Sequence, residues 1–150
     1  MRTFIYLVII LFFASCTDLS DGETYTYTVK NKSGVPVKIY AFNSNSMTPG
    51  EVIHTITLQN NEELTKKFED GSPPKGYNFS DFFGKPSGRS VTDSIRVIYD
   101  NTKHQSFNSK NCNGEDRNPI NICAYQGVDE SFTFTAEDYK NAVNCNSNCE

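Results

Sequence analysis

Five cysteines and two histidines are the residues of this chain best suited to covalent or metal chemistry. Cys112, Cys123, Cys145 and Cys149 lie in the last third of the chain, and their even number predicts two disulfides in an oxidising compartment. Local pairing, the first with the second and the third with the fourth, encloses only ten and three residues and is favoured. Crossed pairing would close longer loops and, in the chain-entropy model, stabilise the fold more. The thiol spacing and the lack of a histidine nearby in the sequence disfavour zinc, so we expect no metal.

Neither histidine belongs to a recognisable catalytic motif. His54 shares the parity of the apolar residues in 52–58, which favours a hydrogen-bonded position at the core margin over a base or ligand. His104 lies in a polar segment that predicts a turn or strand edge, and residues 111–116 offer oxygen ligands without the spacing of a calcium-binding EF-hand. The chain has no nucleophile elbow, zinc-protease motif or phosphate-binding glycine loop. We therefore expect no catalytic residues, no cofactor and no enzyme; a small hydrolase is the less favoured alternative.

The first sixteen residues have the order of an export signal. Arg2 precedes an uncharged apolar run over residues 4–13, and two small residues lead to Cys16. About 20 apolar residues are needed to cross the hydrocarbon core of a membrane, so this run is too short to span it. We expect residues 1–15 to be removed as a signal peptide; an ordinary secretory signal with a leftover cysteine is the alternative.

Cleavage there would leave one domain on a short tether. Residues 16–23 are polar and rich in Asp, Ser and Thr, which predicts a flexible segment, and residues 24–150 have the length of a single domain. Arg2 is the only charged residue removed, so the net charge changes from −4 to −5. The basic residues are scattered, which argues against nucleic acid as a partner.

Alternation of apolar and polar residues with a period of two dominates the domain. The first two runs, 25–29 and 35–41, flank Asn-Lys-Ser-Gly at 31–34, which predicts a hairpin. Further runs occur at 52–58, 64–68, 95–99 and 132–134. We expect an all-β fold, a single β-sandwich with Ig-like or Greek-key connections, and a small β-barrel as the alternative. Residues 135–143 predict a short C-terminal helix capped by Thr135.

The interval 70–92 interrupts this alternation. It is rich in Gly and Pro, yet it carries the aromatic residues Tyr77, Phe79, Phe82 and Phe83. Rings in a long loop can stack on a sugar or dock on a protein partner, which makes them the possible binding loop of this chain. The alternative is that they plug an open edge of the sandwich.

Phe13-Ala-Ser-Cys16 resembles the lipobox of bacterial lipoproteins, in which the cysteine is diacylated before cleavage. With the acidic spacer 18–23 and a β domain, the whole chain resembles the small lipoproteins of the Bacteroidetes phylum. The resemblance implies acylation of Cys16 and stable anchoring, because each buried methylene adds about 0.8 kcal/mol of membrane affinity. Thr17 after the cysteine implies sorting to the outer membrane. The acidic spacer resembles the export signal of that phylum to the cell surface, which implies display there, and the periplasmic face is the alternative.

Three further segments carry the same resemblance: 25–34, 93–100 and 132–139. Asp93-Ser94-Ile95 resembles the O-glycosylation tripeptide of that phylum, which makes Ser94 a possible glycan site; a plain strand start is the alternative. The expected role is a surface-exposed binding or accessory module with a protein or glycan partner, which would use either the 70–92 loop or the solvent-exposed face of a sheet. A structural, inhibitor or immunity-type envelope lipoprotein is the alternative.

Overall fold

The computed structural model describes residues 22–43, 51–74, 76–84, 92–109, 117–146 and 149. Cys16, Cys112, the signal segment and the 111–116 loop therefore lie outside the described residues, and the predictions made for them stay predictions. The elements in chain order are β1 (Thr24–Lys32), β2 (Val37–Phe42), β3 (Val52–Leu58), β4 (Glu63–Glu69), the 3-10 helix η1 (Phe79–Phe83), β5 (Ser94–Tyr99), β6 (Lys103–Asn108), β7 (Asp129–Thr135), α2 (Ala136–Asn141) and β8 (Val143–Asn144).

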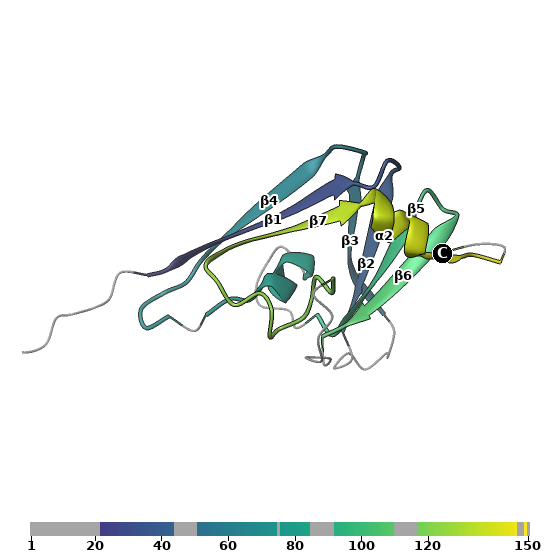
Figure 1. Ribbon diagram of the computed structural model, residues 1–150. Helices are drawn as coiled ribbons and strands as arrows, with labels where there is room; N and C mark the ends of the chain where they lie inside the picture. The colour runs from purple at the N-terminus through teal and green to yellow at the C-terminus, as the bar shows by residue number, and fades with distance from the viewer. Residues whose placement is uncertain are drawn as a thin grey trace, which may run out of the picture.

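Two sheets pack against each other with their apolar faces inward (Figure 1). Sheet A has the order β4-β1-β7, with β1 antiparallel to β4 and parallel to β7. Sheet B has the order β3-β2-β5-β6-β8 and is antiparallel throughout. The predicted β-sandwich with a short C-terminal helix is confirmed, and the described strands do not close into a barrel.

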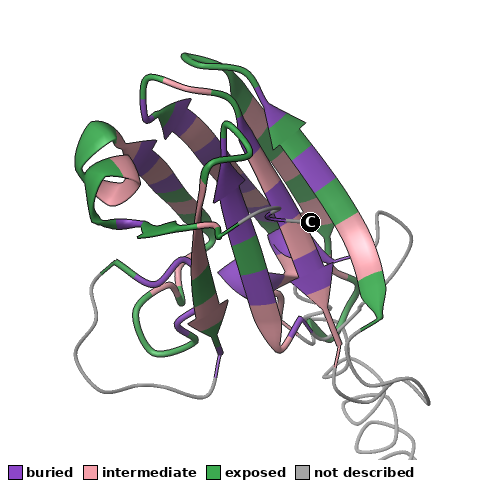
Figure 2. Ribbon diagram, turned by 90° about the vertical axis from the view of Figure 1, so that its right-hand side faces the viewer, coloured by how far each residue is buried: buried purple, intermediate pink, exposed green. Residues whose placement is uncertain are grey.

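The alternation seen in the sequence is the alternation of burial in the structure. In β1, Tyr25, Tyr27 and Val29 are buried, while the threonines between them are partly exposed. Figure 2 shows the same alternation of buried and more exposed positions along the strands. Each apolar residue on the inner face removes surface from water at about 25 cal/mol per Å², which is why the strands hold this register. The predicted runs correspond to β1–β5 and β7. The strands β6 and β8 have mainly polar sequences, and only the strand-edge interpretation of the 101–106 segment anticipated the former.

The predicted hairpin at 31–34 is wrong, because β1 and β2 belong to different sheets. The segment is instead a corner in which Asn31, fully buried, donates from its amide to the carbonyls of Val35 (2.8 Å), Leu58 (3.0 Å) and Gln59 (3.1 Å). Gly34 has a φ of +90°, which favours glycine because it has no Cβ. The alternation pattern identifies strands but not their partners.

The aromatic residues of the 70–92 interval lie in the core. Phe79, Phe82 and Phe83 are 1%, 0% and 0% exposed, and Tyr77 packs against the same cluster. The helix η1 carries these rings and begins at a capping box formed by Asn78 and Asp81. The possible binding loop is therefore corrected: its rings fill the space between the sheets, as the plug interpretation predicted, because burying them is worth more than exposing them.

The C-terminal helix is shorter than the predicted 135–143. Thr135 caps α2 in a capping box with Asp138, as expected, but the helix ends at Asn141 because residues 143–144 pair with β6. No helix among the described residues combines the length and the apolar character required to cross a membrane. Beyond β8, a disulfide joins Cys145 to Cys149, whose Cα atoms are 5.4 Å apart.

This bond is the local pairing favoured from the sequence, and it rules out the crossed arrangements for these two cysteines. Cys123 is also disulfide-bonded, and its partner lies outside the described residues. The oxidised state expected of these cysteines is thus present in the part of the chain that the structure describes.

Candidate functional site

The outer face of sheet B, the face turned away from sheet A, carries the strongest candidate site. Cross-strand register places Arg96 of β5 directly beside Tyr40 of β2, and Phe42 beside Val52 of β3. Tyr40, Phe42 and Arg96 point outward because they alternate with the buried residues of their strands. Val52 has the parity of the buried residues of β3, and the register shift between Ala41 and Phe42 is what brings it beside the outward Phe42. An outward patch of this kind is apolar at one end and cationic at the other.

Two cavities open on this face, and we call them the tail cavities. The first, of about 270 Å³, is lined by Tyr40, Phe42, Val52, Arg96 and Cys149. The second, of about 220 Å³, lies on the other side of the Arg96 side chain and is lined also by residues of β6, β8 and the tail: His104, Val143, Asn144, Cys145, Asn146 and Cys149. Since Arg96 and Cys149 line both cavities, a ligand in either cavity would lie beside the guanidinium.

Described residues near the C-terminus form part of the walls: Cys149 lines both cavities, and Cys145 and Asn146 also line the second. Cys149 is only 5% exposed there, although it follows the last strand. Its disulfide partner Cys145 is fixed by a hydrogen bond from its N–H to the Thr102 carbonyl at 2.9 Å, and its Sγ lies 3.5 Å from His104 Nδ1. The disulfide therefore holds Cys149 against the sheet.

Among the described residues that line the tail cavities, the one cationic side chain is Arg96. None of the described residues lining either cavity is acidic, whereas the net charge of the full chain is −4. Lys38 adds a second cation to this face, with its Nζ 5.0 Å from the centroid of the Tyr40 ring. Within the described ranges, no carboxylate lies at ion-pair distance from Arg96. The site is thus suited to an anion.

A third cavity on sheet B, of about 290 Å³, lies near the β5–β6 turn and is lined by Lys38, Thr57, Ile98 and Asp100 among others. The turn itself has positive φ at Asp100 (47°) and Asn101 (54°), as in a type I′ turn. This cavity contains both a carboxylate and an ammonium group, so it lacks the single charge sign of the tail cavities.

The margin between β3 and β4 contains the other titratable cluster. Lys66 faces inward from β4, and its Nζ donates to the Phe82 carbonyl at 2.6 Å and lies 5.0 Å from the Phe82 ring centroid. Burial lowers the pKa of Lys66. Burial first, and the positive charge of Lys66 second, lower the pKa of His54. His54 occupies the core margin as predicted, and the charged neighbour acting on it is a cation, which favours the neutral form of its imidazole.

The remaining predicted residues do not converge on a site. Ser94 begins β5, where it is half-buried and pairs with Phe42 on one side and Asn108 on the other. Its glycosylation stays a prediction. Among the residues that the structure describes, no three His, Cys, Asp or Glu side chains cluster as a metal site would require. The signal for the tail cavities was present in the sequence as two aromatic residues at the polar positions 40 and 42, but it was not recognised.

Comparisons with protein-family models, with curated proteins and with solved structures found no significant match to this chain.

Proposed function

We propose that this chain is a lipid-anchored lipoprotein of the bacterial outer membrane whose β-sandwich acts as a binding module. In this proposal Cys16 carries the acyl chains, residues 17–23 form the tether, and the outer face of sheet B is the binding surface. The observation that carries the binding role is the pair of tail cavities on that face, which lie around a cation without a carboxylate partner among the described residues.

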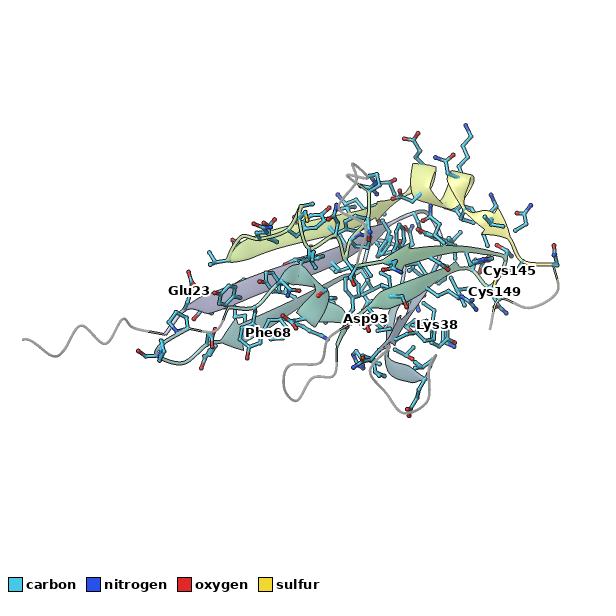
Figure 3. All side chains as sticks on the ribbon, turned by 90° about the horizontal axis from the view of Figure 1, so that it is seen from below. Glu23, Lys38, Phe68, Asp93, Cys145 and Cys149 are labelled. Carbon is cyan, nitrogen blue, oxygen red and sulfur yellow. A yellow bond between two sulfur atoms is a disulfide. The ribbon has the colours of Figure 1, made fainter. Side chains whose placement is uncertain are left out.

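The position of the tail cavities relative to the tether supports this assignment. Figure 3 shows Glu23 at one end of the sandwich and Cys145 and Cys149 at the other. A chain anchored through residues that precede Glu23 would hold the tail cavities at the end remote from the bilayer, where a soluble ligand or partner has access to them. The Cys145–Cys149 disulfide supports an oxidising location outside the cytoplasm.

Anchoring is tested by comparing the wild-type chain with Cys16→Ser in membrane fractions of a bacterium that processes lipoproteins. The expected result is that the wild-type protein sediments with membranes and its intact mass includes acyl chains, whereas the variant is released. Two chains give stable anchoring and a single chain does not, so the mass should show at least two. Equal membrane partitioning of the two proteins, or no acyl mass on the wild type, would refute the lipoprotein assignment.

The orientation is tested separately on intact cells by the accessibility of the domain to an external protease. We expect digestion of the domain without breaking the outer membrane, with a periplasmic protein left intact as the control. Protection of the domain until the outer membrane is opened would place it on the periplasmic face and remove the cell-surface part of the proposal.

A further inference from the structure

We propose that the tail cavities bind a small organic carboxylate, with its carboxylate on Arg96 and its apolar body between Tyr40, Phe42 and Val52. This inference rests on the proposed function, since it assigns the ligand class of the same binding surface. It differs from the protein or glycan partner expected from the sequence.

The guanidinium of Arg96 determines the charge of the ligand. β5 lies between β2 and β6, so Arg96 is flanked in register by Tyr40 and Ser106, and neither neighbour brings a compensating charge. A guanidinium presents a planar pair of N–H donors that matches the two oxygens of a carboxylate. An anion in either cavity is attracted by Arg96, and none of the described lining residues carries a negative charge that would repel it.

The walls determine the rest of the ligand. Tyr40 and Phe42 are two aromatic residues on the outward side of β2, and Val52, which is 43% exposed, pairs with Phe42. On the far side of Arg96, Val143 is 63% exposed at the rim of the second cavity. Exposed apolar side chains that border a cavity indicate a ligand with apolar surface of its own. A ligand made only of charged or hydroxyl groups would leave these side chains in water.

The cavity volumes limit the size. Sites for drug-sized ligands span about 300–1,000 Å³, and the first tail cavity has about 270 Å³. One ring or a short alkyl chain beside the carboxylate therefore fits, and a large polymer does not enter. One guanidinium in the shared wall of the two cavities matches one carboxylate.

The disulfide completes the site. Cys149 contributes to the lining of both cavities only while its bond to Cys145 holds the tail on the sheet. Removing the bond would free that wall and expose the cavities to water, which would weaken the ion pair by raising the local dielectric constant. Ligand binding should therefore depend on the oxidised state of these two cysteines.

The test is calorimetric titration of the detergent-solubilised full chain with benzoate and with hexanoate, alongside benzamide, which has nearly the same shape as benzoate and no charge. We expect both carboxylates to bind and benzamide to bind at least tenfold more weakly. Arg96→Gln should weaken benzoate binding about tenfold or more, and Arg96→Lys should lie between it and the wild type. Lys67→Gln is the matched control, because it removes one exposed positive charge from β4 on the other sheet.

A second variant pair tests the wall. Cys145→Ser with Cys149→Ser should lower benzoate affinity severalfold while the far-ultraviolet circular dichroism of the sandwich is retained. Benzamide binding as tightly as benzoate, equal effects of Arg96→Gln and Lys67→Gln, or no carboxylate binding at millimolar concentration would each overturn the inference. These titrations do not use the anchor, so they can fail while the Cys16→Ser fractionation succeeds, and the two proposals are separately refutable.

Discussion

Replacing Asn31 by Ala should destabilise the sandwich more than any other single polar-to-alanine change in the β1–β2 corner. The Asn31 side chain is fully buried and makes five hydrogen bonds: three donated to carbonyls, and two accepted from the N–H (3.0 Å) and hydroxyl (2.7 Å) of Ser33. The Leu58 carbonyl ends β3 of sheet B and the Gln59 carbonyl follows it, whereas Asn31 belongs to β1 of sheet A. The side chain thus ties the two sheets together.

The magnitude follows from these bonds. A protein hydrogen bond contributes about 1 kcal/mol net, and a buried group left without a partner costs about 1–3 kcal/mol. Since the two amide hydrogens are shared by three carbonyls, we expect Asn31→Ala to lower the free energy of unfolding by about 3–5 kcal/mol, estimated from those per-bond values. Domains are commonly stable by about 5–15 kcal/mol, so the variant should still fold at low temperature.

The assay is urea unfolding of the full chain followed by tyrosine fluorescence, because the chain has eight tyrosines and no tryptophan. Asn60→Ala is the matched control: its side chain accepts one exposed hydrogen bond, from the Gly34 N–H at 3.0 Å. It should cost less than about 1 kcal/mol by the same reasoning. A loss below about 1 kcal/mol for Asn31→Ala, or equal losses for the two variants, would refute the role given to the corner.

Three other variants test the core and its titratable groups. Phe82→Ala should cost about 3–5 kcal/mol in urea unfolding, because this fully buried ring packs on Phe79 and Phe83 and its loss leaves a cavity. The folded-state pKa of His54 lies below its ordinary value, so the unfolded chain binds the proton more readily and the wild type should lose stability as the pH falls below about 6.5. In His54→Gln, the melting temperature should fall less between pH 7 and pH 5 than it does in the wild type. Burial raises the pKa of Tyr99, so the folded chain keeps the phenol proton to a higher pH than the unfolded chain does, and the folded state loses stability as the pH rises above about 10. Tyr99→Phe should make the alkaline decline in melting temperature shallower. An unchanged decline would contradict this assignment.

The inner faces of the sheets were predictable because burial imposes a strict period of two. Tyr25, Tyr27 and Val29 alternate with threonine in the sequence, and the structure buries them in that order. Strand pairing was not predictable by the same means. The polar link after β1 has the composition of a hairpin turn, yet it connects two sheets, and the residue that decides this, Asn31, interacts with carbonyls near position 58, far away in the sequence.

The aromatic residues of η1 show a second limit. The described part of the 70–92 interval contains no strand, as its Gly and Pro residues indicated, but composition cannot tell whether a ring there points to solvent or to the core. Asn78 and Asp81 form the capping box that orients the segment so that Phe79, Phe82 and Phe83 enter the space between the sheets. Of the two binding surfaces that the sequence offered, the aromatic loop is therefore disfavoured, and the candidate site lies on the solvent-exposed face of a sheet.

The outer face of sheet A serves as an internal comparison for that of sheet B. On sheet A, outward side chains satisfy one another: Thr28 and Thr65 hydroxyls lie 2.9 Å apart, and Lys30 lies 3.2 Å from Glu63. The polar and charged side chains of such a face are satisfied by one another and by water, without a ligand. On sheet B, the corresponding positions around Arg96 hold aromatic and aliphatic groups, a cation without a carboxylate partner among the described residues, and a disulfide-held tail in place of a solvated edge. Because both faces belong to one chain in one solvent, solubility alone does not account for their difference, whereas the proposed anionic ligand with an apolar body would.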